Sequence, residues 1–201
     1  MSNKGTLFVI SGPSGVGKGT VLKKVLGRID NLFYSVSVTT RAPRVGEING
    51  VHYHFISKEE FETLKATDGM YEYVEAIGSG YGTPKKIVME KLEQGIDVIL
   101  EIETLGAAKV RAKTECVSIF IAPPNVEELA HRLFFRGTEN AEQRKSRMKK
   151  CEEELPCMYD YDYIVVNDKI DQTAEELIAI IKAERLKVKN NVELIEKILK
   201  S

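Results

Sequence analysis

The sequence has few cysteines, no long apolar segment and no excess of positive charge. Its 201 residues include only Cys116, Cys151 and Cys157, without a CxxC pair, so reduced thiols are expected rather than a disulfide framework or a zinc site. No stretch is long enough to span a bilayer, and the N-terminus lacks the apolar segment of a signal peptide. Lys and Arg total 29 against 30 Asp and Glu, whereas nucleic-acid-binding domains are usually basic. We therefore expect a cytoplasmic protein that binds neither membrane nor nucleic acid.

Two kinds of catalytic centre also lack support. His52, His54 and His131 do not have the spacing of metal ligands with a third partner. No nucleophile–base pair is recognisable either. In-line group transfer, which needs positioning and charge but no covalent intermediate, remains compatible with the sequence.

What is present indicates an α/β protein. Short apolar runs typical of buried strands occur at 6–10, 97–102, 117–121 and 163–166, and helical patterns such as 20–29 separate them. This alternation predicts a parallel sheet covered by helices on both faces.

Three further segments have a different pattern. Strand-like runs at 34–38, 51–56 and 70–77 surround one short helix at 58–66, which predicts a small mixed α+β insertion. Residues 124–160 are charged and helical without a convincing strand, as expected of a mobile lid. The end of the chain, 172–200, is amphipathic and helical, with a break near Asn190 and Asn191.

A phosphate-binding loop links the first strand to the first helix. It consists of Gly12, Pro13, Ser14, Gly15, Val16, Gly17 and Lys18. Glycines let successive backbone N–H groups converge, the helix N-terminus adds positive potential, and the lysine reaches the β- and γ-phosphates. The loop predicts ATP binding.

The loop departs from the strict pattern directly after its lysine. That pattern has a Ser or Thr there, whose hydroxyl binds Mg²⁺. Here the position is Gly19, with Thr20 next, and Lys-Gly-Thr resembles the adenylate kinase version of the loop. We expect Thr20, a water molecule, or an acid such as Glu101 to supply the magnesium contact.

Arg41 and Arg44 follow in the segment 35–44, with Pro43 between them. Paired guanidinium groups suit a phosphate because each presents forked donors. Alone, such arginines are more often solvated surface groups. The phosphate loop upstream favours the phosphate-binding interpretation.

These motifs together resemble the guanylate kinases, over nearly the whole chain. The resemblance rests on SGPSGVGKGT at 11–20, SVSVTTRAPRVGEINGVHYHF at 35–55, YGT at 81–83, LEIETLGA at 100–107, IFIAPP at 119–124 and RLFFRGTE at 132–139. It implies the reaction of ATP with GMP to give ADP and GDP, with Mg²⁺. It also implies a P-loop NTPase-type core (1–34, 90–125 and 158–201), a GMP-binding subdomain (35–89) and a lid (126–157).

Site residues are carried over by position. The resemblance assigns GMP binding to Ser37, Arg41, Arg44, Tyr53, Glu72, Tyr81, Thr83 and Glu103. A carboxylate at Glu72 would accept from the N1–H and the exocyclic amine of guanine, whereas adenine has an acceptor at N1. Without the resemblance, Glu72 would be taken for a solvent-facing charge on a strand.

Glu101 and Glu103 end a buried strand, where ligands of open α/β sheets bind. By resemblance, Glu101 is the acid near the metal and phosphates, and Glu103 contacts the purine. Two positions depart from the family: Leu105 replaces its usual Gln, and Gly80 replaces its usual Asn.

Lid arginines complete the predicted site. Arg136 and Arg147 match catalytic arginines of the family, together with Lys18 and Arg41, and Arg132 matches a further ATP phosphate contact. Asn167 resembles part of the adenine-side loop, although a plain turn fits almost as well. Lys150 and its basic neighbours 144, 145 and 149 are expected to form a solvated face.

The sequence thus predicts a guanylate kinase, a monomer or homodimer, with ATP and GMP as substrates. The alternative is a guanylate-kinase-like module that binds proteins and has little catalysis. Phosphate loops of such modules are typically degraded, and this one is intact.

Overall fold

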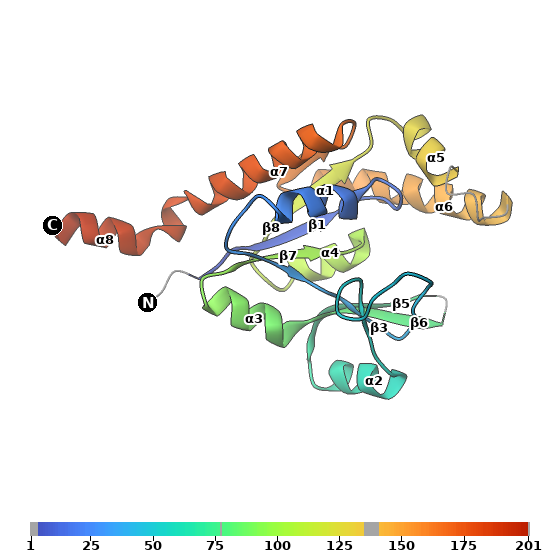
Figure 1. Cartoon of the computed structure of the whole chain (residues 1–201), viewed down its shortest axis with the longest axis horizontal. Helices are drawn as coiled ribbons and strands as arrows, with labels where there is room; N and C mark the ends of the chain where they lie inside the picture. Colours follow the sequence, from blue (N-terminus) through green and yellow to red (C-terminus); the bar gives the residue numbers. More distant parts are fainter. Residues whose placement is uncertain (1–3, 77, 135–140, 201) are drawn as a thin grey trace.

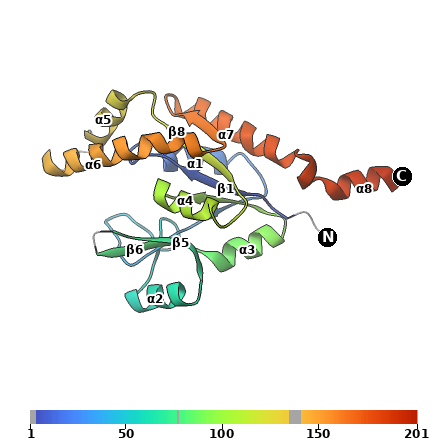
Figure 2. The same cartoon turned by 180° about the vertical axis from the view of Figure 1, so that it is seen from behind.

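The computed structural model describes residues 4–76, 78–134 and 141–200 and contains two sheets surrounded by helices (Figures 1 and 2). The larger sheet is entirely parallel in the order β2-β7-β1-β8-β9. Its strands are β1 (Leu7–Ser11), β2 (Leu32–Ser35), β7 (Asp97–Glu101), β8 (Val117–Ala122) and β9 (Tyr163–Val166). The expected α/β core with a parallel sheet is confirmed.

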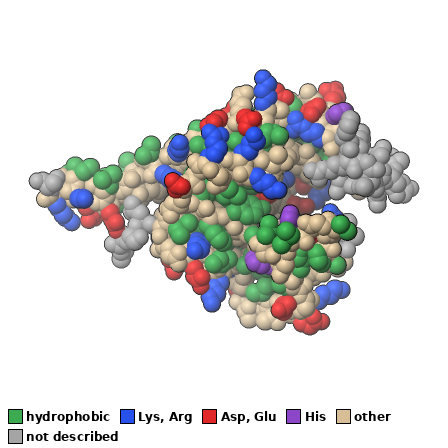
Figure 3. All heavy atoms as spheres, in the orientation of Figure 1, with side chains coloured by type: hydrophobic (Ala, Val, Ile, Leu, Met, Phe, Trp, Pro, Cys, Tyr) green, Lys and Arg blue, Asp and Glu red, His purple; other side chains and the backbone are tan. Residues whose placement is uncertain are grey.

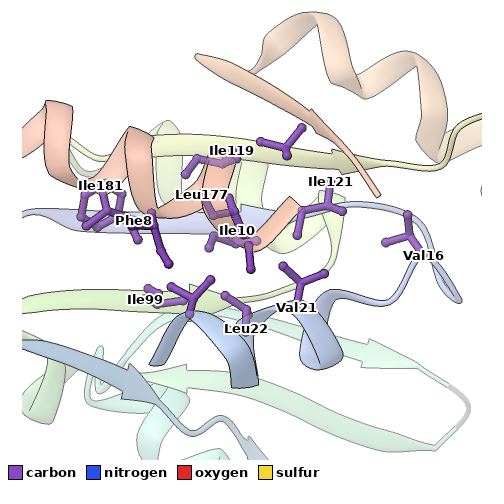
Figure 4. Packing of buried hydrophobic residues seen from close by; sticks show 14 of the residues in the cluster. Phe8, Ile10, Val16, Val21, Leu22, Ile99, Ile119, Ile121, Leu177 and Ile181 are labelled. Carbon is purple, nitrogen blue, oxygen red and sulfur yellow. The ribbon is translucent and has the colours of Figure 1, made fainter. Parts of the chain in front are cut away.

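Helices bury both faces of this sheet. Helices α1 (Lys18–Leu26) and α7 (Ile170–Arg185) cover one face, and α3 (Lys85–Glu93) and α4 (Thr104–Arg111) cover the other. Side chains of a strand alternate between faces, so Phe8 and Ile10 pack with α1 and α7, while Leu7 and Val9 pack with α3 and α4. Figure 4 shows side chains of the first of these clusters, with Val16 of the phosphate loop at its edge.

The second sheet is small and mixed. It has the order β4-β3-β6-β5, with β3 (Val38–Thr39), β4 (His54–Phe55), β5 (Met70–Ala76) and β6 (Ser79–Pro84). Helix α2 (Lys58–Ala66) packs against it and begins with a capping box formed by Ser57 and Glu60. The predicted mixed insertion with one short helix is therefore present.

The prediction of one strand over 34–38 is wrong. Ser35 pairs with Leu100 in the central sheet, whereas Val38 pairs with Gly82 in the second sheet. Two linking residues, Val36 and Ser37, carry the chain from one sheet to the other. Residues common in strands lie on both sides of this link, aromatic ones before it and β-branched ones after it, and they hide the break. Strand 51–56 is also shorter than predicted, because residues 48–52 form a turn before His54.

Helices α5 (Val126–Phe134) and α6 (Ala141–Glu154) follow β8, as expected of the charged helical region. After α7, a 3₁₀ turn at Val188–Asn190 separates helix α8 (Val192–Lys200), which confirms the predicted break. A second 3₁₀ segment, Leu155–Asp160, precedes β9. None of the helices in the described ranges has the length and apolar character needed to cross a bilayer.

Candidate active site

The phosphate loop lies at the carboxyl end of β1, next to the end of β7, because Ile10 pairs with Glu101. Ligands of open α/β sheets bind at such edges. Gly12, Gly15 and Gly17 have φ values of 148°, 84° and 96°, which side chains other than glycine rarely tolerate. A Cβ at Gly12 would lie 2.2 Å from the carbonyl oxygen of Ile121. Glycine is thus required at these positions both by the positive φ angles and by the lack of room for a Cβ atom.

Asn167 holds the phosphate loop through a hydrogen bond to the loop backbone. Its side chain is buried, and Nδ2 donates to the carbonyl of Val16 over 2.7 Å. The hydroxyl of Thr173 donates to Asn167 Oδ1 over 3.2 Å. A Cβ at Gly17 would lie 2.7 Å from Asn167 Nδ2. Asn167 therefore supports the loop, and its predicted contact with ATP stays a prediction.

Lys18 is folded back onto its own loop. Its Nζ donates to the carbonyl oxygens of Gly12, over 2.6 Å, and Pro13, over 3.3 Å. Burial lowers the pKa of the Lys18 ammonium, and the negative charges of Glu101 and Glu154 oppose that effect. A phosphate group would supply the close anionic partner that this buried ammonium lacks in the loop.

Glu154 is a loop neighbour that the sequence analysis did not single out. It ends α6, is only 6% exposed, and its Oε2 has no hydrogen-bond partner among the described residues. Burial raises the pKa of its carboxyl, while Lys150, Lys18 and the backbone N–H of Ser14 favour the charged form. A glutamate in a charged helix gives no sequence signal of such burial.

Glu101 is the acid that fits a magnesium ion here. The hydroxyl of Tyr34 donates to its Oε2 over 2.9 Å, and a Cβ at Gly19 would lie 3.7 Å from both carboxylate oxygens. Thr20, the other candidate ligand, is exposed. The described residues contain no cluster of three metal-ligating side chains. One carboxylate beside a phosphate site suits Mg²⁺, which commonly keeps several waters and binds substrate phosphates.

Arg41 is held by an acid that the sequence analysis missed. Its two terminal nitrogens donate to the two carboxylate oxygens of Glu47, each over 2.9 Å. The backbone N–H of Arg44 donates to the same carboxylate over 2.7 Å, while the Arg44 side chain is exposed. The hydrogen bond from Arg41 is the largest factor that lowers the pKa of Glu47, to about 2. This forked geometry fixes the guanidinium plane.

Tyr53 and Tyr81 complete the Arg41 cluster. The Tyr53 ring lies 5.6 Å from the guanidinium carbon of Arg41 and 6.0 Å from the Tyr81 ring. A hydrogen bond with Tyr81 also stabilises charged Arg41. Burial raises the pKa of the Tyr53 hydroxyl, with a smaller contribution from Glu101. The cluster thus lies within electrostatic reach of the acid beside the phosphate loop.

Glu72 is buried, contrary to the solvent-facing interpretation of its strand pattern. It is 7% exposed, and Thr83 donates to its Oε1 over 2.8 Å. A Cβ at Gly106 would lie 2.8 Å from Oε2, so the α4 backbone passes close to the carboxylate. Burial raises the pKa of Glu72, and the hydrogen bond from Thr83 opposes that rise. Ser37 lies in the link between sheets, where its carbonyl accepts from the N–H of His54.

Glu103 is exposed and ion-paired with helix α6. Lys150 Nζ donates to Glu103 Oε2 over 2.8 Å and lies 3.9 Å from Glu154 Oε1. Lys150 was expected on a solvated face that pairs with nearby acids. It does approach Glu154, but its short contact is with Glu103, 47 residues away in sequence.

The predicted lid arginines are only partly described. Arg132 donates from Nη1 to the carbonyl of Asn167, over 2.8 Å, and from Nε to Glu128. Arg136 lies outside the described residues. Arg147 belongs to α6, but its side chain also lies outside the description. Their catalytic roles stay predictions.

Comparison with known proteins identifies the family. A sequence model of the guanylate kinase family matches residues 4–184. The chain belongs to the guanylate kinase family. It is 48% identical to a guanylate kinase of Clostridium perfringens, over 93% of this chain and 87% of that protein. It is 47% identical to a guanylate kinase of Latilactobacillus sakei over 99% of both chains. The crystal structure of a guanylate kinase from Anaplasma phagocytophilum has a TM-score of 0.78 at 36% identity, over 94% of this chain and 90% of that one.

The two departures from the family pattern have different surroundings. A Cβ at Gly80 would lie 2.6 Å from two ring carbons of Phe61. The aromatic ring therefore fills the space of a side chain at this position. Leu105 is exposed on α4, and nothing in its surroundings explains the replacement of a polar residue.

Proposed function

We propose that this guanylate kinase transfers the γ-phosphoryl group of ATP to GMP, with the residues of the two clusters above in the roles expected from the sequence. The observation that carries the proposal is an intact phosphate loop around Lys18 together with a second anion-binding cluster around Arg41. Two phosphate sites in one chain suit transfer between two nucleotides.

The ATP side is proposed to consist of the loop 12–20 with Arg132, Arg136 and Arg147. Lys18 would exchange its two carbonyl partners for phosphate oxygens, which removes the cost of a buried ammonium without a close anion. Glu101 would hold Mg²⁺ directly or through water, with Thr20 as the other candidate. When bound, the ion would neutralise charge on the phosphates.

The GMP side is proposed to lie on residues 35–89, as a subdomain on the core 1–34, 90–125 and 158–201. Arg41, Arg44, Tyr53 and Tyr81 would bind the GMP phosphate. Glu72, Thr83, Ser37 and Glu103 would read the nucleoside. A buried Glu72 carboxylate suits the two adjacent donors of guanine and leaves adenine N1 without a donor. Residues 126–157 would form a lid that closes over ATP. The predicted cytoplasmic location is also the compartment in which an enzyme that acts on free nucleotides would meet its substrates.

The test is a coupled assay of ADP formation with ATP and a panel of nucleoside monophosphates. We expect GMP to be preferred over AMP by at least about 100-fold. Lys18→Ala and Arg41→Ala should each lose most GDP formation while remaining folded, and Lys23→Ala, an exposed change in the same helix as Lys18, should not. Near-normal turnover of both variants would refute the site assignment, and equal rates with AMP would refute the substrate.

A protein-binding module with little catalysis is the remaining alternative. The Lys18 loop and the Arg41–Glu47 pair retain ordered geometry, which a module without nucleotide chemistry would not need. Absence of GDP formation by the unmodified chain in the same assay would favour that alternative.

A further inference from the structure

The hydroxyl of Tyr34 lies against the carboxylate of Glu101, at the edge of the central sheet beside the phosphate loop. It donates to Glu101 Oε2 over 2.9 Å. A phenol keeps its proton at neutral pH, and a hydrogen bond to a charged acceptor is stronger than one between neutral groups. Tyr34 precedes the segment 35–55 and belongs to none of the motifs that indicated the family. The role of Tyr34 therefore follows from its contacts alone.

The pairing of β2 with β7 places the two side chains together. The strands are parallel, and Tyr34 lies opposite Ile99, two residues before Glu101. Side chains two residues apart on a strand point to the same face, so Tyr34, Ile99 and Glu101 share the face that α1 covers. The ring of Tyr34 packs against the buried cluster that contains Ile99, and its hydroxyl reaches along the strand to Glu101. The packing of the ring thus fixes the position of the donor.

Gly19 of helix α1 lies on another side of the Glu101 carboxylate. A Cβ at Gly19 would be 3.7 Å from both carboxylate oxygens, which is an ordinary contact distance. This is also the position at which the strict phosphate-loop pattern has a Ser or Thr, whose hydroxyl binds Mg²⁺. The Glu101 carboxylate therefore borders the space of the hydroxyl that this chain lacks.

Within the described part of the chain, the Glu101 carboxylate has no salt-bridge partner, and Tyr34 is its only hydrogen-bond donor. The ammonium of Lys18 is within electrostatic reach, but it donates to carbonyl oxygens of its own loop. Figure 3 shows the molecule hollowed between the region of α1 and the second sheet, so a hydrated cation can approach this edge. A carboxylate in such surroundings suits a magnesium ion that keeps several of its waters.

We propose that Tyr34 is a positioning residue of the magnesium site, which holds Glu101 in the orientation that lets its carboxylate replace the hydroxyl missing at Gly19. This role rests on the proposed function, in which Glu101 binds Mg²⁺ directly or through water. By engaging Oε2, Tyr34 restricts rotation of the carboxylate and leaves Oε1 available. Loss of a group that hydrogen-bonds to a metal ligand commonly lowers metal affinity by about 10- to 100-fold.

A second tyrosine–glutamate pair in the same sheet has a purely structural setting. Tyr163 of β9 donates to Glu184 Oε1 over 2.6 Å. Glu184 is fully buried, and the ammonium of Lys187 lies 2.7 Å from the same oxygen. The charge of Glu184 is thus compensated within the protein, whereas Glu101 has no such salt bridge among the described residues. Tyr163 therefore provides the matched control for Tyr34.

Two other roles of the Tyr34 hydroxyl would have different consequences. A bond that only stabilises the fold would change the free energy of unfolding and leave the metal dependence of nucleotide binding unchanged. A hydroxyl that contacts a substrate phosphate would change kcat at saturating metal, or the KM for GMP. A positioning role through Glu101 changes the metal dependence and leaves both kinetic constants nearly unaltered.

The experiment compares nucleotide binding with and without metal. Isothermal titration calorimetry measures the affinity of the full chain for a non-hydrolysable ATP analogue in Mg²⁺ and in EDTA, and the ratio of the two gives the metal advantage. Tyr34→Phe should lower this ratio by about tenfold, the lower end of such effects, because the phosphates also hold the ion. The Mg²⁺ concentration for half-maximal rate should rise by a similar factor, with little change in kcat at saturating Mg²⁺ or in the KM for GMP. Tyr163→Phe should change none of these quantities, and urea denaturation checks that both variants fold.

Glu101→Gln distinguishes failure of the proposed magnesium ligand from failure of the role of Tyr34. It should lower the metal advantage at least as much as Tyr34→Phe, and the double variant should lose less than about twofold more, because the two residues act as one unit. An unchanged metal advantage in Glu101→Gln would refute the magnesium role of Glu101, and the role of Tyr34 with it. If Glu101→Gln lowers the advantage and Tyr34→Phe does not, Glu101 keeps its proposed role and that of Tyr34 is overturned. Independent losses in the double variant, or a lower kcat of Tyr34→Phe at saturating Mg²⁺, would overturn it as well.

Discussion

The ammonium of Lys150 in α6 lies 2.8 Å from the carboxylate of Glu103, at the N-terminus of α4. This ion pair joins a helix of the proposed lid to an acid proposed to contact GMP. Guanine or ribose would have to compete with Lys150 for that carboxylate. If Glu103 binds GMP as proposed, we expect this contact to weaken nucleotide binding in this conformation.

Lys150→Met should strengthen GMP binding. The pair is about half exposed, so its loss should lower the KM for GMP by only about two- to fivefold. The matched control is Lys149→Met, which removes a neighbouring lysine whose acid partner, Glu153, is 3.9 Å away and exposed. Steady-state kinetics at saturating ATP provide the measurement. A higher KM for GMP in Lys150→Met would show that Lys150 helps to bind the nucleotide instead.

Glu72→Gln should lower the activity with GMP without lowering the stability of the fold. Burial raises the pKa of Glu72 above its unfolded value, so at pH values between these two pKa values the folded state keeps a proton that the unfolded chain has lost. Stability from this group is thus present at low pH and falls as the pH rises through the interval between the two pKa values. Glutamine removes that loss and can still accept the hydrogen bond from Thr83.

We therefore expect the free energy of unfolding of Glu72→Gln to equal or exceed that of the wild type at pH 8. The advantage should shrink at pH 5, as measured by urea denaturation at both values. GMP turnover should fall by about 100-fold or more, because the amide presents a donor where guanine also has a donor. A variant that is clearly less stable than the wild type at pH 8 would contradict this account.

Much of the core could be predicted from the sequence, because its strands are buried on both faces. Continuous apolar runs such as those of β1 and β8 have few alternative structures. The split between β2 and β3 could not be predicted, since Ser35 and Val38 belong to different sheets and only their pairing partners reveal it. Strand β6, with two glycines, has no apolar pattern at all.

The residues of the candidate site also fall into those that the sequence predicts and those that only the tertiary structure reveals. The loop glycines and Lys18 were predictable because their chemistry dictates their spacing. Glu47 and Glu154 were not, since their roles come from contacts made by tertiary structure. Glu47 lies six residues from Arg41 in a turn, and Glu154 approaches a loop 140 residues earlier in the sequence. Glu72 was found through resemblance, and its burial contradicts the pattern of its strand.

Glu47→Gln should weaken GMP binding through Arg41. Glu47 accepts from both terminal nitrogens of Arg41 and from the backbone of Arg44, so it fixes the guanidinium and its loop together. A glutamine offers only one acceptor oxygen. The KM for GMP should rise by about tenfold with a smaller change in kcat. The reason is that the Arg41 guanidinium is held less firmly for binding, whereas the charges that act on the reacting phosphate are unchanged.

Glu75→Gln is the matched control, since Glu75 lies in strand β5 of the same small sheet and pairs with Lys65 of helix α2. The low pKa of Glu47, about 2, also implies that this pair stays charged above about pH 3. A fall in GMP affinity between pH 7 and pH 5 should then persist in Glu47→Gln. If that fall disappears in the variant, the titration of Glu47 is its source.

Gly80→Asn, which restores the side chain usual in the family, should destabilise this chain. A Cβ at Gly80 would lie 2.6 Å from the Phe61 ring, which is buried and packs edge-on against Tyr73. Overpacking of this kind costs about 1–3 kcal/mol. Phe61→Leu alone should also destabilise, since it leaves a cavity under β6.

The double variant Gly80→Asn/Phe61→Leu should lose less stability than the sum of the two single changes, because the smaller leucine vacates the space that the introduced asparagine needs. Urea denaturation of all four proteins gives the coupling free energy, which should be favourable by more than about 0.5 kcal/mol. Gly78→Asn is the control: its φ of 74° suits asparagine, and, apart from its chain neighbours, no atom of the described residues lies within 4 Å of the added Cβ. Additive losses would mean that the Phe61 ring can move aside, and the departure at Gly80 would then have no steric basis.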